Sequence, residues 1–303
     1  MNSLFTRLGI PLLILTASKA ALAELATVSG LNALPEVELS RLTEQDGSAL
    51  GAKALAIHAA DWKHGETEHF IYHFQRSYVA TPVSVEAEFH FRVVSKELGK
   101  SGAAWSGKAH IYIFEQAEDW ASFQTVGGLE PWTGGIQSGG SLFIVRNPAY
   151  KFTDNSLGHE IAHLVLRRFY GYDIPLWLNE GFAQYVSKGA HASYQRARGY
   201  LAKPTSNGVP REKLFPLRAL VTMSYPPAEQ VDIFYDQSER LVRFLVAADR
   251  ASFLELLELS AAGHALDAAL TRTSNGRFAN VAALEDQFVA YAAKDAATSF
   301  AER

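Results

Sequence analysis

The sequence predicts an α+β fold with a strand-rich N-terminal half and a helical C-terminal half. Short segments of β-branched and aromatic residues, separated by polar and glycine-rich breaks, recur up to residue 145. Beyond Glu180, apolar residues recur at helical spacing almost to the end of the chain. The chain contains no internal repeat, so we expect one α+β unit rather than a repeat array.

The composition is that of a globular protein. The chain has 303 residues, of which 48% are hydrophobic, and a net charge of -4. This length is sufficient for a sizeable core, and the charge balance provides no basic surface for a nucleic-acid partner. Because the chain has no cysteine, its core must be stable without disulfides.

The first residues have the pattern of a secretory signal peptide, which we assign to residues 1–23. Arg7 supplies the positive end, residues 8–15 form an apolar run, and Ala21 and Ala23 define a small-residue cleavage site. We expect cleavage after Ala23 and an exported protein, periplasmic or secreted, with an uncleaved anchor as the alternative. No other stretch has the length of a membrane-spanning helix, so we expect no membrane span in the mature chain.

The elements of the N-terminal half are predicted from local patterns. Segments with strand character combine β-branched and aromatic residues, whereas helical segments carry apolar residues on one face. Gly99 signals the end of the first helix. In chain order we expect strands at 52–58 and 69–74, a helix at 79–98, a strand at 108–114, a helix at 116–123 and, after the glycine-rich residues 127–140, a strand at 141–145.

Several histidines lie in or near these elements. His69 and His73 share one face of an expected strand, which allows either a common metal ion or, as the more frequent case, two solvent-facing side chains. We expect the second arrangement. His90 is expected to be structural, and His191 and His264 are expected to face solvent.

The residues around His159 carry the clearest chemical signal. His159 and His163 are four residues apart, and on a helix this spacing directs both imidazoles at one ion. Glu160 is turned about a quarter of a circle from His159. It therefore misses the ion but can reach a water beside it, as a general base must.

Glu180 is the candidate for a third metal ligand. A catalytic zinc ion takes three protein ligands and leaves a fourth position to water, so two histidines need one further donor. Gly171 signals the end of the helix that contains His163, and Pro175 opens another helix that contains Glu180. The short turn between them returns the second helix against the first.

The segments HEIAH, at residues 159–163, and WLNEGFAQY, at residues 177–185, resemble the gluzincin metallopeptidases. Within that group they resemble the peptidase MA-like domains and, more distantly, the aminopeptidase N-like family. The resemblance implies a zincin-like fold and zinc-dependent hydrolysis of peptide or protein substrates with one Zn²⁺ ion. The residues that match the family's motif are His159, His163 and Glu180 as zinc ligands and Glu160 as the catalytic base.

Two further segments resemble parts of the gluzincin active site. The segment around Tyr235 is similar to one in which a tyrosine faces the substrate carbonyl, which implies a catalytic role for Tyr235. Residues 142–145 resemble the edge strand along which an extended substrate adds itself as a further strand. A buried central strand is the alternative interpretation of residues 142–145.

One departure from the aminopeptidase N-like pattern concerns the substrate's amino terminus. Those enzymes carry a glutamate before the zinc helix that binds the terminal ammonium, and the neutral Gln137 is its nearest counterpart here. We therefore expect an endopeptidase. The alternatives are an exported zinc-containing binding protein of the cell envelope without proteolytic activity and a purely structural zinc site. The latter usually has four protein ligands, often cysteines.

The chain beyond Glu180 is expected to consist of helices with a turn at Asn275 and Gly276. We divide the chain after the signal peptide into a lead-in segment at 24–66, a zincin-like catalytic domain at 67–250 and a C-terminal helical region at 251–303.

Overall fold

The computed structural model describes residues 33–100, 105–130, 134–146, 155–171, 173–199 and 211–301. The expected signal peptide at 1–23, including its cleavage site after Ala23, lies outside these ranges. None of the helices in the described ranges has the length and apolar character needed to cross a membrane.

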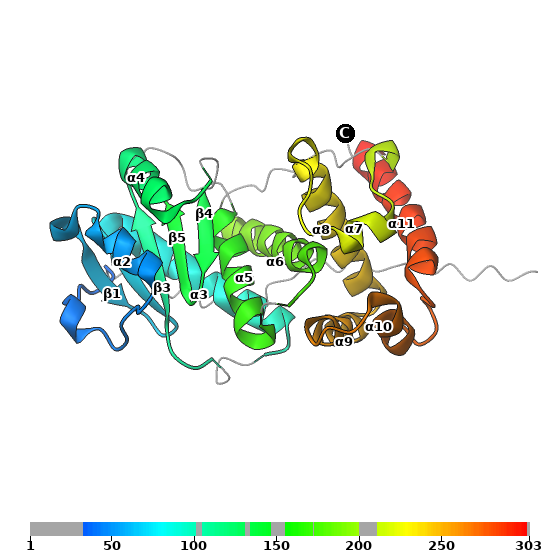
Figure 1. The fold of residues 1–303 in the computed structure, drawn as a ribbon, viewed down its shortest axis with the longest axis horizontal. Helices are drawn as coiled ribbons and strands as arrows, with labels where there is room; N and C mark the ends of the chain where they lie inside the picture. The colour runs from blue at the N-terminus through cyan, green and yellow to red at the C-terminus, as the bar shows by residue number, and fades with distance from the viewer. Residues whose placement is uncertain are drawn as a thin grey trace, which may run out of the picture.

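A five-stranded mixed sheet forms one end of the molecule (Figure 1). Its inner strands β2, β3 and β5 are parallel, and an antiparallel strand pairs on each side, so the order is β1-β2-β3-β5-β4. The strands are β1 (Lys63–Glu66), β2 (Phe70–Phe74), β3 (Ala109–Phe114), β4 (Gly135–Ser138) and β5 (Ser141–Val145). β1 lies at the end of the expected lead-in segment at 24–66. It pairs in the same sheet as the four strands of the expected catalytic domain.

The expected edge strand at 142–145 is wrong, and the alternative of a buried central strand is confirmed. β5 lies between β3 and β4, and its residues Leu142, Phe143 and Ile144 are all buried because both faces of the strand are covered. The edge strand is β4, which lies within the glycine-rich residues 127–140 that were expected to form a connection. Its half-exposed residues are typical of an edge, and Gly139, at φ 62°, forms the tight turn into β5.

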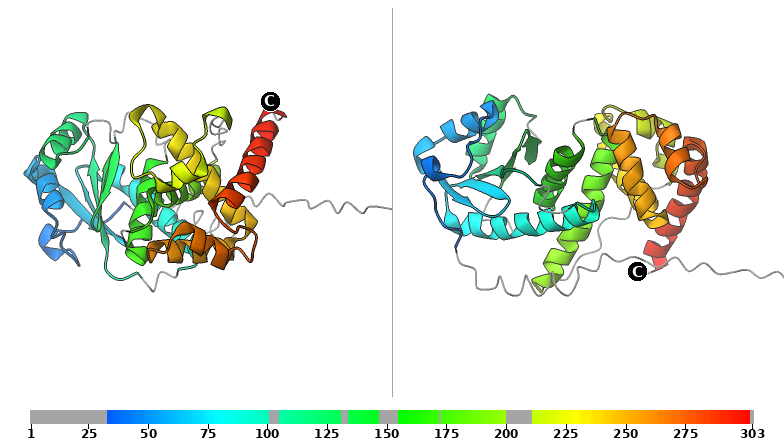
Figure 2. Two further views of the ribbon diagram at one scale, coloured as in Figure 1. Left: turned by 45° about the vertical axis from the view of Figure 1, so that its right-hand side comes forward. Right: turned by 90° about the horizontal axis from the view of Figure 1, so that it is seen from below.

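Helices cover both faces of the sheet (Figure 2). On one face, α3 (Ser77–Glu97) packs beside α5 (Ser156–Tyr170), and together they bury alternate strand residues such as Tyr72 and Ile111. On the other face, α4 (Ala117–Gly127) and α2 (Ala49–Ala56) cover an aromatic cluster around Tyr112. The alternation follows from the two-residue period of a strand. The expected elements at 69–74, 79–98, 108–114, 116–123 and 141–145 are confirmed as β2, α3, β3, α4 and β5.

The strand expected at 52–58 is wrong, because most of this segment belongs to helix α2. The segment contains several alanines, which favour helix, and Ser48 caps the helix by accepting a hydrogen bond from the backbone N–H of Gly51 at 2.9 Å. A short apolar run has no clear period by itself. Two short 3₁₀ helices, η1 (Leu39–Arg41) and η2 (Ala59–Asp61), flank α2.

The second half of the chain is helical, as expected, and extends away from the sheet (Figure 1). Helix α6 (Leu176–Ala197) lies between α5 and α8 (Val231–Ala248) and packs against both. The remaining elements are η4 (Arg211–Lys213), α7 (Leu217–Thr222), η5 (Ala228–Gln230), α9 (Arg250–Ala261), α10 (Leu266–Thr273) and α11 (Val281–Ala301). The expected turn at Asn275 and Gly276 is confirmed, since both residues have positive φ. One hydrophobic core runs from the sheet to Phe288 in α11.

Candidate metal centre

The face of α5 that points away from the core lines a cavity of about 320 Å³. Leu157, Ile161 and Leu164 bury the opposite stripe of the helix in the main core, which fixes its rotation about its own axis. Residues of both expected motifs and of α8 line the cavity: His159, Glu160, His163, Glu180 and Tyr235. The structure thus brings all five predicted site residues together.

Three donor atoms converge on one point in this cavity. The Nε2 atoms of His159 and His163 are 3.0 Å apart, and they lie 3.3 Å and 3.4 Å from Oε2 of Glu180. Donors held at about 2.1 Å in a tetrahedral shell would be about 3.4 Å apart. These three side chains could therefore hold one metal ion.

The charges of His159, His163 and Glu180 depend on one another. Burial alone would raise the pKa of Glu180, but His163 and His159 lower it well below its ordinary value. Burial alone would lower the pKa of His163, but the Glu180 carboxylate raises it to about 9. The carboxylate is thus ionised as a metal ligand must be, and a cation would displace the proton of the histidine.

Asn179 orients one of the two histidines. Its Oδ1 accepts a hydrogen bond from Nδ1 of His163 at 3.1 Å, which leaves Nε2 directed at the donor cluster. The sequence motifs do not identify such a partner. The signal for it is the position of Asn179 directly before Glu180, because the same helical turn that supplies the carboxylate also faces α5.

Tyr235 reaches the cavity because α8 crosses α6 closely. A Cβ atom on Gly181 would lie 2.5 Å from the carbonyl oxygen of Ser238, so only glycine permits this approach. The rings of Tyr235 and His159 are 6.3 Å apart between centroids. Burial, followed by the nearby Glu180 carboxylate, raises the pKa of Tyr235 above its ordinary value, so its hydroxyl keeps its proton and can donate.

The opposite wall of the cavity is formed by the edge strand β4. Gly135 lies beside Glu160, and a Cβ atom there would come within 3.4 Å of Glu160 Cγ. At the other end of β4, Oε1 of Gln137 accepts a hydrogen bond from Nη1 of Arg167 at 3.3 Å. Arg167 follows His163 at the same four-residue spacing that relates the two histidines, which is the sequence signal that could have identified it.

His69 and His73 do not lie where the sequence pattern predicts them. His69 and His73 are both buried, not solvent-facing, and they do not share a site. Nδ1 of His69 is 2.7 Å from Oε2 of Glu88, whereas His73 contacts His64 and His110 at 2.8 Å and 2.9 Å. The expectation that both face solvent is wrong because both sheet faces are covered.

Two of the three remaining assignments agree with the structure. His90 is fully buried within the fold, and His264 is exposed as expected. His191, expected in solvent, is instead half-buried beside Glu86, because the end of α6 packs on α3.

Comparison with known proteins agrees with this geometry. No curated protein matches the chain significantly. A family profile described as the Peptidase MA superfamily matches residues 93–293, which include both motifs, β4 and Tyr235. Because the match covers more than half of the chain and contains all the residues gathered in the cavity, the chain belongs to the Peptidase MA superfamily.

Proposed function

We propose that this protein is an exported, zinc-dependent endopeptidase with a zincin-like active site. The observation that carries the proposal is the convergence of His159, His163 and Glu180 at separations of 3.0–3.4 Å beside the carboxylate of Glu160. Two imidazoles and one carboxylate are a common ligand set of catalytic zinc, which keeps an open position. These three residues would hold the ion.

Glu160 serves as the general base. When bound, zinc supplies a Lewis acid and brings the pKa of a water close to neutrality. Glu160 lies next to the ligands along α5 and faces β4 across the cavity, so its carboxylate can take a proton from the attacking water. The same carboxyl group then transfers that proton to the leaving amine.

Tyr235 serves as the oxyanion donor. Its hydroxyl stays protonated because burial and two neighbouring carboxylates oppose ionisation. A positioned donor of this kind typically contributes about 2.7–4 kcal/mol to the stability of a transition state in which negative charge develops on the carbonyl oxygen. A binding module would require the ligands but neither Glu160 nor Tyr235, which favours an enzyme over the alternative of a zinc-containing binding protein.

The edge strand β4 supports an extended peptide substrate. Among the described residues it pairs only with β5, so its outer backbone groups can pair with a substrate strand. Arg167 at the Gln137 end of the cavity places a positive charge where an aminopeptidase would need a negative one. This charge disfavours a substrate ammonium, which argues against removal of amino-terminal residues. It favours a carboxylate, so we infer a preference for peptides with an acidic residue near the cut bond.

Mass spectrometry of a diverse peptide library after incubation with the zinc-loaded protein tests the proposal, with the Glu160→Gln variant as control. We expect internal cuts that the variant does not make while it retains zinc. Stepwise loss of amino-terminal residues would identify an aminopeptidase and overturn the endopeptidase assignment. No cleavage by a zinc-loaded wild-type protein would favour the binding protein.

A further inference from the structure

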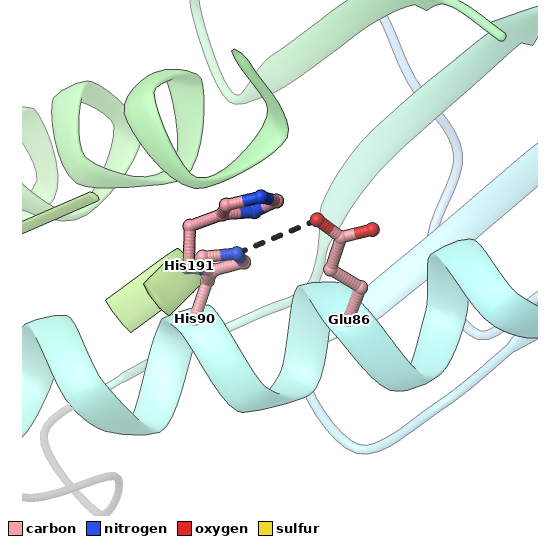
Figure 3. A group of neighbouring side chains, drawn as sticks. All are labelled: Glu86, His90 and His191. Atoms are coloured by element: carbon pink, nitrogen blue, oxygen red, sulfur yellow. Dashed lines mark ion pairs between the residues drawn. The ribbon is translucent and has the colours of Figure 1, made fainter. Parts of the chain in front are cut away.

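A second cluster of metal-binding side chains lies outside the active-site cavity. Glu86 and His90 come from α3 and His191 comes from α6, and one donor atom of each lies within 4.8 Å of the other two (Figure 3). Glu86 and His90 are four residues apart and share one face of their helix. None of the three lines the active-site cavity.

His90 is the most constrained member of this cluster. Its side chain is 0% exposed, and neither ring nitrogen makes a hydrogen bond of normal geometry within the described ranges. Leaving such a group unsatisfied costs about 1–3 kcal/mol, so buried imidazole nitrogens are normally bonded or ligated. Oε1 of Glu86 lies 3.5 Å from Nε2 of His90.

The separation of 3.5 Å between Nε2 of His90 and Oε1 of Glu86 is closer to that between two ligands of one metal ion than to the length of a hydrogen bond. The structure contains a histidine–glutamate hydrogen bond for comparison, between His69 and Glu88, and its length is 2.7 Å. The corresponding separations among the donors of the candidate metal centre are 3.3 Å and 3.4 Å. The separation between His90 and Glu86 is close to these separations between the candidate metal ligands.

We propose that Glu86, His90 and His191 form a second site for a divalent cation of zinc type, with a stabilising role. Two imidazoles and a carboxylate suit zinc, and water would complete the shell. The ion would join α3 to α6 on the core side of α5. The ring of His90 packs against Gly158, where an added Cβ atom would lie 2.5 Å from its Cε1 atom. Joining the two helices would therefore also restrain the start of α5, where His159 follows directly.

Arg146 identifies the competing arrangement. This buried residue lies near enough to Glu86 to act on its carboxylate, as His90 and His191 also do. A network of Glu86 with Arg146 and a protonated His90 would satisfy the same charges without a metal. The positive charge of Arg146 also opposes a nearby cation, so we expect the second site to bind zinc more weakly than the first.

Zinc stoichiometry separates these arrangements. Full-length protein is dialysed to equilibrium against buffered free zinc and its metal content is measured by mass spectrometry. We expect two zinc ions per chain in the wild type and one each in His163→Ala and His191→Gln. The exposed His264→Gln should retain both ions and serves as the matched control. One ion in the wild type and none in His163→Ala would overturn the second site. One ion that survives in His163→Ala but not in His191→Gln would instead overturn the first.

Thermal unfolding gives a readout that does not depend on activity. In the Glu180→Ala background, which removes one of the three ligands of the first site and so weakens zinc binding there, zinc should still raise the unfolding temperature because it binds the folded chain. Adding His191→Gln should remove most of that increase. An increase of the same size in the double variant would contradict the proposal, as would a Glu180→Ala variant that does not respond to zinc.

Discussion

The backbone of Gly181 lies against the carbonyl oxygen of Ser238, so that a Cβ atom on the glycine would come within 2.5 Å of it. This contact joins α6 to α8 one residue after Glu180. It sets how closely Tyr235 approaches the ligand cluster.

Replacing Gly181 with alanine should therefore push α8 away from α6. We expect a loss of roughly 1–3 kcal/mol in the free energy of unfolding, as for other overpacked sites, and a larger fall in kcat than in zinc content. Denaturant titration, steady-state kinetics and metal analysis measure the three quantities. Gly47→Ala is the matched control, because an added Cβ atom there meets nothing within 4 Å. Full activity in Gly181→Ala would show that Tyr235 does not depend on this crossing.

Tyr235→Phe removes only the hydroxyl group. We expect kcat to fall by about 10²–10³, the usual effect of losing one oxyanion donor, while KM and zinc content change little. Kinetics on a peptide identified from the library provide the measurement. A raised KM with unchanged kcat would mean that the hydroxyl binds substrate and transition state equally, which would contradict its proposed role.

Asn179→Ala removes the acceptor for Nδ1 of His163. Without this hydrogen bond, the ring of His163 can rotate or adopt the other tautomer, and we expect a decrease in zinc affinity of about 10–100-fold. Competition with a chelator of known affinity measures this change. Asn179→Asp retains an acceptor and should keep most of the affinity. Equal losses in both variants would point to a packing defect.

Arg167→Gln removes the positive charge at the Gln137 end of the cavity. For peptides with an acidic residue near the cut bond, we expect kcat/KM to fall about tenfold or more, because hydrogen bonds to charged groups contribute about 1.5–3 kcal/mol. Neutral peptides of the same length should be cut at nearly the wild-type rate. To separate an acidic side chain from a free carboxyl terminus, the substrates are compared with and without carboxyl-terminal amidation. An equal loss for acidic and neutral peptides would show that Arg167 does not select a carboxylate.

Acid should destabilise the protein through the buried histidines of the sheet. Burial lowers the folded-state pKa of His64, His73 and His110 below the unfolded value of about 6.5. The unfolded chain therefore binds more protons, so stability is complete above about pH 6.5 and decreases as the pH falls towards the folded pKa values. The slope is at most about 1.4 kcal/mol per pH unit for each histidine.

The His73→Leu variant tests this pH dependence. His73 lies between the other two histidines, so its removal should reduce the slope of stability against pH below 6.5. Urea titrations of both proteins in the same metal state measure the difference, and other titrating groups cancel. Identical slopes would show that the three histidines do not cause the loss of stability in acid.

Local spacing in the sequence determined the parts of the site that lie on single helices. The four-residue interval between His159 and His163 requires only a helix to bring both imidazoles to one face, and a short turn limits where Glu180 can lie. The apolar periods that predicted α3 and the helices beyond Glu180 are also local. The same local reasoning failed for residues 52–58, where a short alanine-containing run is compatible with helix or strand and the Ser48 cap favours helix.

Tertiary structure alone decided which distant segments meet. The sequence alone did not show that β4 rather than β5 would be the edge strand, because strand order is a property of the whole sheet. Three contacts join elements that are far apart in the chain. They are the contact between Gly181 and Ser238, the hydrogen bond between Arg167 and Gln137, and the approach of His191 to α3. Such contacts form only when the core has closed, since the burial that orients each helix comes from all its neighbours at once.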